Sequence, residues 1–115
     1  EIDYGPDENQ TEETVIARIG ADAIAAWDRD AALPPGWKVD PDALRTAWAD
    51  LLERAAHVAA DANVLIVTSN GIARFLPDVV TEMPAGLDRK LKTGAWGTVE
   101  VAGSVTRILD WNMRP

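Results

Sequence analysis

Apolar residues recur at helical spacing in two stretches of the chain. The first stretch follows Asn9 and Thr11, either of which can cap a helix, and Glu12 and Glu13 suit its first turn. Its apolar positions, which continue to about Asp28, are Val15, Ile16, Ile19, Ala23, Ile24 and Trp27. The second stretch opens with Asp40-Pro41, a typical N-cap and first helical residue, and its apolar stripe ends near Ala60. The pattern predicts helices over about 12–28 and 41–60.

Residues 63–68, Asn-Val-Leu-Ile-Val-Thr, show a different pattern. A short apolar run that is mostly β-branched predicts a buried strand. Ser69-Asn70-Gly71 follow directly and open a helical pattern to about Val80, which Pro77 would kink or shorten. The first N–H groups of a helix point at whatever lies before it, so such a turn commonly binds an anion. The turn could hold a catalytic group, only a bound anion, or nothing.

The two ends of the chain suggest further strands. Ile2-Asp3-Tyr4 resembles a short strand, and Gly5-Pro6 then forms a turn. Residues 95–111 alternate with a period of two on either side of Ala102-Gly103, which predicts a hairpin. The expected order is therefore βααβαββ in one layered α/β domain over residues 1–115.

Composition excludes several classes of protein. The chain has no cysteine, so it can hold neither a disulfide nor a cysteine-based metal site. It has a net charge of −8 and no basic stripe, which argues against binding nucleic acid. There is no apolar run of membrane-spanning length and no signal-peptide pattern, so we expect no membrane partner and a cytoplasmic location. The acidic excess lies largely in six N-terminal residues, Glu1, Asp3, Asp7, Glu8, Glu12 and Glu13.

Three segments, in order, resemble the histidine phosphatase superfamily of phosphoglycerate mutase-like proteins, in its C-terminal part. The first, Glu-Ile-Asp-Tyr-Gly, is similar to a family segment in which a Glu precedes a hydrophobic pair and a Gly. The second, Val-Thr-Ser-Asn-Gly-Ile-Ala-Arg, resembles the strand-to-helix stretch that usually reads Val-Val-Ser-His-Gly-Gly, then an apolar pair and Arg. The third, at residues 91–112, resembles the closing hairpin, which typically ends at an Asn. The resemblance implies a layered α/β/α fold that lacks its N-terminal strands here.

The same resemblance implies the chemistry of a site. In the family, a phosphoryl group passes to a His in an Arg-His-Gly motif, a second His and an Arg hold the phosphate, and a Glu protonates the leaving oxygen. Carried over by position, the acid is Glu1, and the phosphate-binding residues are Ser69, Asn70 and Gly71. The second His falls on Ser69 without a gap or on Asn70 after a slip of one residue, and Arg74 occupies the position of the family's Arg. No metal or other cofactor is implied.

Two departures from the family affect the expected function. The sequence contains no Arg-His-Gly motif, and its single His, His57, lies late in a predicted helix. We therefore expect a phosphomonoester hydrolase domain that is inactive as the chain stands. The alternative is a non-catalytic remnant that binds an anion or a protein partner. Its ligand would be a phosphorylated small molecule or an inorganic anion, and either a homo-oligomer or a further N-terminal segment would complete its sheet.

Other interpretations of the same residues are weaker. Ser69 could be a hydrolase nucleophile, but Val67 stands where the nucleophile elbow needs a Gly. The N-terminal carboxylates lack the spacing of a calcium loop and predict a solvated face. Trp27 and Trp48 fall on helical stripes and should pack in the core, whereas Trp96 and Trp111 should pair across the hairpin.

Overall fold

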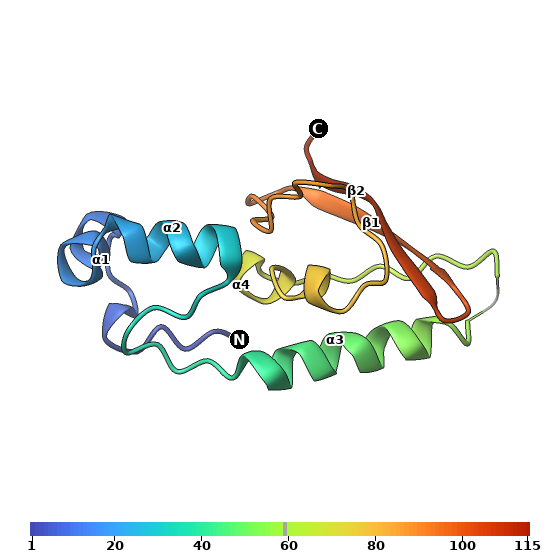
Figure 1. Ribbon diagram of the computed structural model, residues 1–115, viewed down its shortest axis with the longest axis horizontal. Helices are drawn as coiled ribbons and strands as arrows, with labels where there is room; N and C mark the ends of the chain where they lie inside the picture. The colour runs from blue at the N-terminus through green and yellow to red at the C-terminus, as the bar shows by residue number, and fades with distance from the viewer. Residues whose placement is uncertain (59) are drawn as a thin grey trace.

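Helices make up most of the N-terminal half, and one antiparallel hairpin closes the chain (Figure 1). The computed structural model describes residues 1–58 and 60–115 and measures 48 × 28 × 23 Å. None of the helices in these ranges has the length and apolarity that a membrane crossing requires. The elements, with η for a 3₁₀ helix, are η1 (Gly5–Asp7), α1 (Glu12–Ile19), α2 (Ala21–Asp30), α3 (Pro41–Ala55), α4 (Asn70–Ala73), η2 (Leu76–Asp78), β1 (Trp96–Ala102) and β2 (Val105–Met113).

The first predicted helix is present but broken in two. Thr11, rather than Asn9, caps α1, and its side chain accepts a hydrogen bond from the Thr14 N–H at 3.2 Å. Gly20 then adopts a φ of 87°, a conformation that favours glycine and ends the helix before α2 begins. The prediction of one continuous helix was wrong. The apolar spacing continues across Gly20 and therefore does not reveal that the backbone of this residue is not helical.

The second predicted helix begins as expected. Asp40 caps α3 by accepting a hydrogen bond from the Ala43 N–H at 3.1 Å, and Pro41 is its first residue. The helix ends at Ala55 rather than near Ala60. Its stripe buries Trp48 and Leu52, and the Trp48 indole donates to the Ile72 carbonyl at 2.9 Å.

The buried strand predicted at residues 63–68 is not formed. This segment belongs to no strand in the described chain, and Leu65 and Val67 are each 89% exposed. A strand needs a neighbour with which to exchange backbone hydrogen bonds, and no segment in the described ranges pairs with this one. The short strand predicted at residues 2–4 is reduced to a single bridge between Asp3 and Lys38.

The helix predicted after Gly71 is also shorter than expected. α4 has a single turn, and η2 replaces the rest, with Pro77 inside it. Pro77 has no N–H to donate, which is consistent with the loss of regular α-helix.

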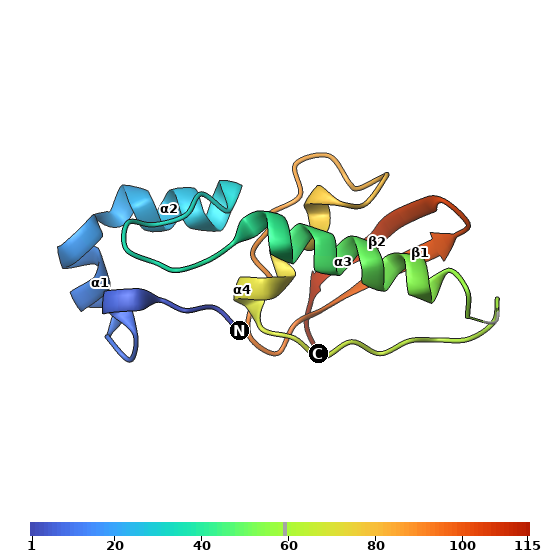
Figure 2. The same cartoon turned by 90° about the horizontal axis from the view of Figure 1, so that it is seen from below.

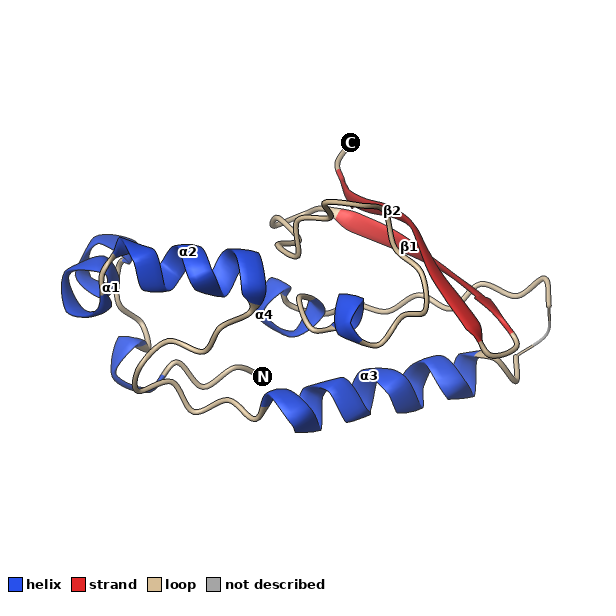
Figure 3. Ribbon diagram, viewed as in Figure 1, coloured by secondary structure: helices blue, strands red, loops and turns tan. Residues whose placement is uncertain are grey.

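The C-terminal hairpin is confirmed, and Figure 3 shows it as the strand-bearing part of the molecule. The register pairs Trp96 with Met113 and Ala102 with Val105. The two tryptophans are therefore not cross-strand partners; the Trp111 ring instead packs over Gly97, where an added Cβ would lie 2.5 Å from its Cε3. Helices combined with an antiparallel C-terminal hairpin give the mixed α/β class that the sequence predicts.

The core lies where α2, α3 and η2 meet, near the middle of the long axis (Figure 2). Trp27 packs edge-on against Trp37 and Phe75, with ring centres 5.1 and 5.9 Å apart. Such edge-to-face pairs add about 0.5–1.5 kcal/mol beyond the burial of their area. The predicted core positions Trp27 and Trp48 are confirmed. The buried members of the core are Ile2, Trp27, Ala31, Trp37, Trp48, Leu52, Phe75 and Leu76.

Candidate functional site

The turn at residues 69–71 joins the extended segment to α4. Ser69 has extended backbone angles, φ −88° and ψ 160°, and its Oγ accepts a hydrogen bond from the Ile72 N–H at 3.4 Å. The Ser69 carbonyl accepts from the Ala73 N–H at 2.9 Å. The N–H groups of Asn70 and Gly71, the first two helical residues, have no carbonyl one turn back to pair with. Two backbone donors and the Ser69 hydroxyl are therefore grouped at this turn.

Arg74 fixes the orientation of the Asn70 side chain. The guanidinium donates from Nη2 to Asn70 Oδ1 at 3.2 Å and from Nε to the Asn70 carbonyl at 3.3 Å. Because an arginine can only donate, the amide atom that faces it is the oxygen, and the Asn70 Nδ2 remains available as a donor elsewhere.

The Arg74 guanidinium itself points into the protein. Arg74 is 1% exposed, and its Nη1 donates to the Trp27 carbonyl at 2.9 Å and to Asp28 Oδ1 at 3.3 Å. Burial lowers the pKa of Arg74, and the hydrogen bond to Asp28 partly offsets this effect. Arg74 therefore anchors the turn to α2, and it contributes positive charge from behind the turn rather than a free donor in front of it.

The N-terminal segment packs directly on this turn. Gly71 is buried, and a Cβ added there would lie 2.7 Å from Ile2 Cγ1 and 3.3 Å from the Tyr4 hydroxyl. Because glycine has no side chain, the side chains of Ile2 and Tyr4 can pack directly on the backbone of the turn. Side chains alternate between the two faces of an extended segment, so Ile2 and Tyr4 share one face and Glu1 and Asp3 the other. The face with Ile2 and Tyr4 is the one that touches the turn.

Glu1 is the residue next to this contact. It is exposed, and its Oε1 accepts a hydrogen bond from the Ile2 N–H at 3.4 Å. Burial raises the pKa of the neighbouring Tyr4, and the charges of Glu1 and Glu8 raise it slightly further. The positive charge of Arg74 has the opposite effect and lowers this pKa. The contact with the turn itself is made by Ile2, the residue after Glu1, and by Tyr4.

Sequence patterns did not identify Tyr4 as part of this site. Its hydroxyl can both donate and accept, and it lies against Gly71. Its position two residues after Ile2, on the same face of an extended segment, is the signal that could have revealed it. That signal becomes useful only when the element on which the face packs is known.

His57 and Ser69 do not come together as the base and nucleophile of a serine hydrolase would. His57 follows the end of α3, is exposed, and lines a surface hollow with Gly103 and Ser104 rather than the turn. Within the described residues no histidine lies in the contacts of Ser69, so the structure offers no support for a serine hydrolase.

The N-terminal acids do not all form the solvated face that was expected. Asp7 is buried, and it accepts hydrogen bonds from Arg18 Nε at 2.7 Å and from the Trp37 indole at 2.8 Å. A carboxylate can be buried in this way because a charged partner and a second donor satisfy its oxygens. In the described ranges, no three acidic or histidine side chains gather as a metal site would require.

Comparison with known proteins identifies the family of the chain. The family model of the histidine phosphatase superfamily (branch 1) matches residues 1–114. Neither the curated proteins nor the solved structures contain a significant match. The family match includes the N-terminal segment, the turn at residues 69–71 and the hairpin in a single alignment over nearly the whole length, and on that basis the chain belongs to the histidine phosphatase superfamily.

Proposed function

We propose that this chain carries the phosphate-facing turn and the proton donor of a phosphomonoester hydrolase. The observation that supports the proposal is the contact of Ile2 and Tyr4 with Gly71. Ile2 follows Glu1 directly, so this contact supports a position of Glu1 near a turn that lies far from it in sequence. The family's reaction needs an acid and a phosphate-binding turn in the same place.

In this proposal the phosphate oxygens accept hydrogen bonds from four donors at the turn. They are the N–H groups of Asn70 and Gly71, the Ser69 hydroxyl and the Asn70 Nδ2. Asn70 is held in the necessary orientation by Arg74. The Ser69 hydroxyl is free to donate because its bond to the Ile72 N–H uses it as an acceptor.

Glu1 has the role of the general acid. Its carboxyl group would give a proton to the leaving oxygen of the phosphomonoester, which would then depart as an alcohol. An exposed carboxyl group beside the turn is free to rotate towards a bound ester. In the family mechanism the phosphoryl group passes to a histidine of an Arg-His-Gly motif, which the 115 residues do not contain.

The turn also lacks the second histidine of the family, because Ser69 or Asn70 occupies its position. Neither side chain can supply the charge of an imidazolium, so phosphate binding relies on neutral donors and on the buried Arg74. By comparison with the loss of one oxyanion donor, transition-state stabilisation should fall by about 2–4 kcal/mol. Affinity for inorganic phosphate should be weak, roughly millimolar, which corresponds to about −4 kcal/mol.

The second candidate is a non-catalytic domain that binds an anion at the same turn. The position of His57 favours it, since the one histidine in the sequence lies away from residues 69–71. Both candidates share the phosphate-facing turn, and they differ in whether Glu1 acts on a bound ester.

The test is a titration of inorganic phosphate into ¹⁵N-labelled protein. We expect amide shifts centred on residues 68–72, weakened in the Ser69→Ala variant and unchanged in Ser104→Ala, which alters the same side chain in the hairpin turn. If the folded protein shows no shifts at residues 68–72, the turn is only a structural connector and the proposal fails. To separate the two candidates, we would add an alkyl phosphate: a Glu1→Gln effect on its binding but not on that of inorganic phosphate favours the acid role.

A further inference from the structure

A chain of side-chain contacts runs from Lys90 to the turn at residues 69–71. The Lys90 Nζ donates to Asp28 Oδ2 at 3.0 Å, and Asp28 Oδ1 accepts from Arg74 Nη1 at 3.3 Å. Arg74 in turn donates from Nη2 to Asn70 Oδ1 at 3.2 Å. The Asp28 carboxylate therefore has one cation on each oxygen, and it connects the loop that precedes β1 with the turn.

The charge of Arg74 is balanced by Asp28. Arg74 is 1% exposed, and among the described residues Asp28 is the one carboxylate within ion-pair distance of it. The main-chain acceptors of Arg74, the carbonyls of Trp27 and Asn70, are neutral and also accept backbone hydrogen bonds of their own helices. A buried guanidinium that loses its carboxylate carries an uncompensated charge, which is strongly unfavourable inside a protein. Without Asp28 we expect the guanidinium to turn towards solvent and away from Asn70.

The loop before β1 presents Lys90 to Asp28 in a defined conformation. Asp88 Oδ1 accepts a hydrogen bond from the Lys90 N–H at 3.0 Å, which closes a turn between side chain and backbone. Arg89, between these two residues, pairs with Asp78 of η2. Consecutive residues thus attach the loop to η2 and to α2. Because Lys90 holds Oδ2 of the Asp28 carboxylate, Oδ1 stays directed at the guanidinium.

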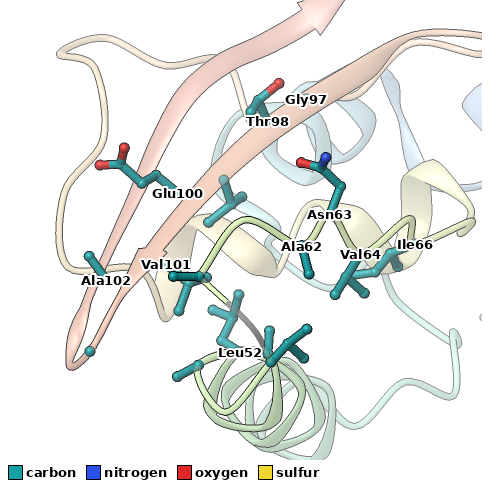
Figure 4. Close-up of a pocket in the computed structure, with 16 residues that line it drawn as sticks. Leu52, Ala62, Asn63, Val64, Ile66, Gly97, Thr98, Glu100, Val101 and Ala102 are labelled. Atoms are coloured by element: carbon teal, nitrogen blue, oxygen red, sulfur yellow. The ribbon is translucent and has the colours of Figure 1, made fainter.

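These contacts are separate from the pocket between α3, residues 62–66 and β1. Figure 4 shows that pocket, whose wall includes Leu52, Val64 and Val101. The residues in contact from the loop to the turn are not among the described residues that line it. The orientation of the Asn70 side chain therefore depends on α2 and on the loop before β1, rather than on the residues of this pocket.

We propose that Asp28 is a positioning residue for the turn at residues 69–71. The inference rests on the proposed function of the turn, because it concerns the Asn70 Nδ2 as a donor to phosphate. Asp28 keeps the Arg74 guanidinium beside Asn70 Oδ1, and this contact leaves Nδ2 to face a ligand. Lys90 fixes the Asp28 carboxylate. Asp28 acts through Arg74 and makes no contact with the ligand.

Charge and position predict opposite results for the Asp28→Asn variant. The substitution removes a negative charge near the turn, so electrostatics alone predicts tighter binding of an anion. Loss of position predicts weaker binding of inorganic phosphate, by about fivefold, since one oriented hydrogen bond contributes about 1 kcal/mol. Titration of phosphate into ¹⁵N-labelled protein, followed by the amide shifts of residues 68–72, measures the affinity. Wild-type or tighter binding in Asp28→Asn overturns the inference.

Asp30→Asn is the matched control for this titration. It makes the same change two residues later, at an exposed carboxylate that ends α2 and pairs with the exposed Arg29. Its affinity for phosphate should equal that of the wild type or be slightly higher.

The side-chain amide of Asn70 gives a second readout, which needs no phosphate. The sequence holds three other asparagines, so the pair of NMR signals from this group can be assigned. We expect its order parameter to fall in Asp28→Asn and to stay unchanged in Asp30→Asn. If the wild type binds no phosphate, the proposed function of the turn fails, and this readout still decides whether Asp28 positions Asn70. An unchanged order parameter in Asp28→Asn overturns the inference.

Variants of Lys90 test the same contacts without removing the buried pair. The Lys90 side chain is 42% exposed, and Lys90→Met should keep the helical circular dichroism of the wild type. We expect its affinity for phosphate to fall by about twofold, as for the loss of a partly exposed ion pair. The Asn70 order parameter should fall as well, and Lys90→Arg should restore both values. A loss of affinity with an unchanged order parameter would be an effect of charge alone and would overturn the role of Lys90.

Discussion

The Arg74 guanidinium lies 4.1 Å from the centre of the Trp27 ring and donates a hydrogen bond to the carbonyl of the same residue. One buried side chain thus joins the turn at residues 69–71 to α2 by a cation–π contact and by hydrogen bonds. Because Arg74 also holds Asn70, the orientation of a proposed ligand depends on packing in the core. Stability and anion binding are therefore expected to change together at this position.

Replacement of Arg74 should be costly. Arg74→Met removes the buried ion pair with Asp28 and the side-chain donor to Asn70 Oδ1, while the carbonyls of Trp27 and Asn70 keep only their backbone donors, so we expect the free energy of unfolding to fall by about 3 kcal/mol. Arg29→Met is the matched control, since the Arg29–Asp30 pair is exposed and should be worth at most about 1 kcal/mol. Urea denaturation followed by circular dichroism measures both values. Equal losses in the two variants would show that Arg74 does not anchor the turn.

Gly71 should tolerate no side chain while Ile2 is present. Gly71→Ala places a Cβ 2.7 Å from Ile2 Cγ1, so the N-terminal segment must move, at a cost of about 1–3 kcal/mol in the free energy of unfolding. The same substitution in an Ile2→Ala background should cost less, because the clashing atom is gone. A double-mutant cycle by urea denaturation gives the coupling energy. Additive effects would place the N-terminal segment away from the turn.

Acid should weaken the attachment of the N-terminal turn. The hydrogen bond from Arg18 lowers the pKa of Asp7 below its ordinary value of 3.8; burial opposes this effect, and the Trp37 hydrogen bond reinforces it. A carboxyl group whose pKa is lowered by folding stabilises the folded state above its unfolded pKa, and this contribution disappears as the pH falls through the folded pKa.

Melting temperatures measured from neutral pH to about pH 2 should show this loss in the wild type. The Asp7→Asn variant should melt lower at neutral pH and should depend less on pH in the acid range. Asp50→Asn, a change of the same kind at an exposed position of α3, should follow the wild-type curve. If Asp7→Asn also follows it, the Arg18 contact contributes nothing to folding.

The 115-residue chain should release no phosphate from an aryl phosphate above the buffer rate. It contains no Arg-His-Gly motif to accept the phosphoryl group, and His57 is exposed after the end of α3. A colorimetric phosphate assay on the purified protein measures this rate. Turnover that disappears in Ser69→Ala would make Ser69 a nucleophile, and turnover that disappears in His57→Ala would give that role to the histidine.

Local sequence signals predicted those parts of the fold that are determined locally. The Asp40-Pro41 start of α3 and the turn after Ala102 depend on residues within a few positions of one another, and both are confirmed. The strand predicted at residues 63–68 was wrong because pairing depends on a second segment, which composition cannot supply. The break at Gly20 was missed because a glycine inside an apolar stripe is compatible with either a helix or its end.

The residues of the candidate site also differ in whether local sequence or a contact between distant segments determines them. Ser69, Asn70 and Gly71 were predicted from a local turn and from the resemblance, and their role as phosphate ligands stays a prediction. The resemblance also indicated Glu1. Tyr4 was missed because its relation to Gly71 depends on a contact between distant segments, and no spacing along the chain encodes that contact.

The tryptophan-rich core has a consequence for optical measurements. Trp27, Trp37 and Trp48 are buried together in the core, Trp111 of β2 packs against that core, and Trp96 of β1 is 47% exposed. Intrinsic fluorescence will therefore be dominated by emission from the core and its contact with the hairpin. If the hairpin detaches first, a part of the fluorescence change through Trp111 will coincide with the loss of β-sheet signal in the infrared amide band, and the main part will follow at higher temperature. Coincident transitions would mean that the core and the hairpin unfold as one unit.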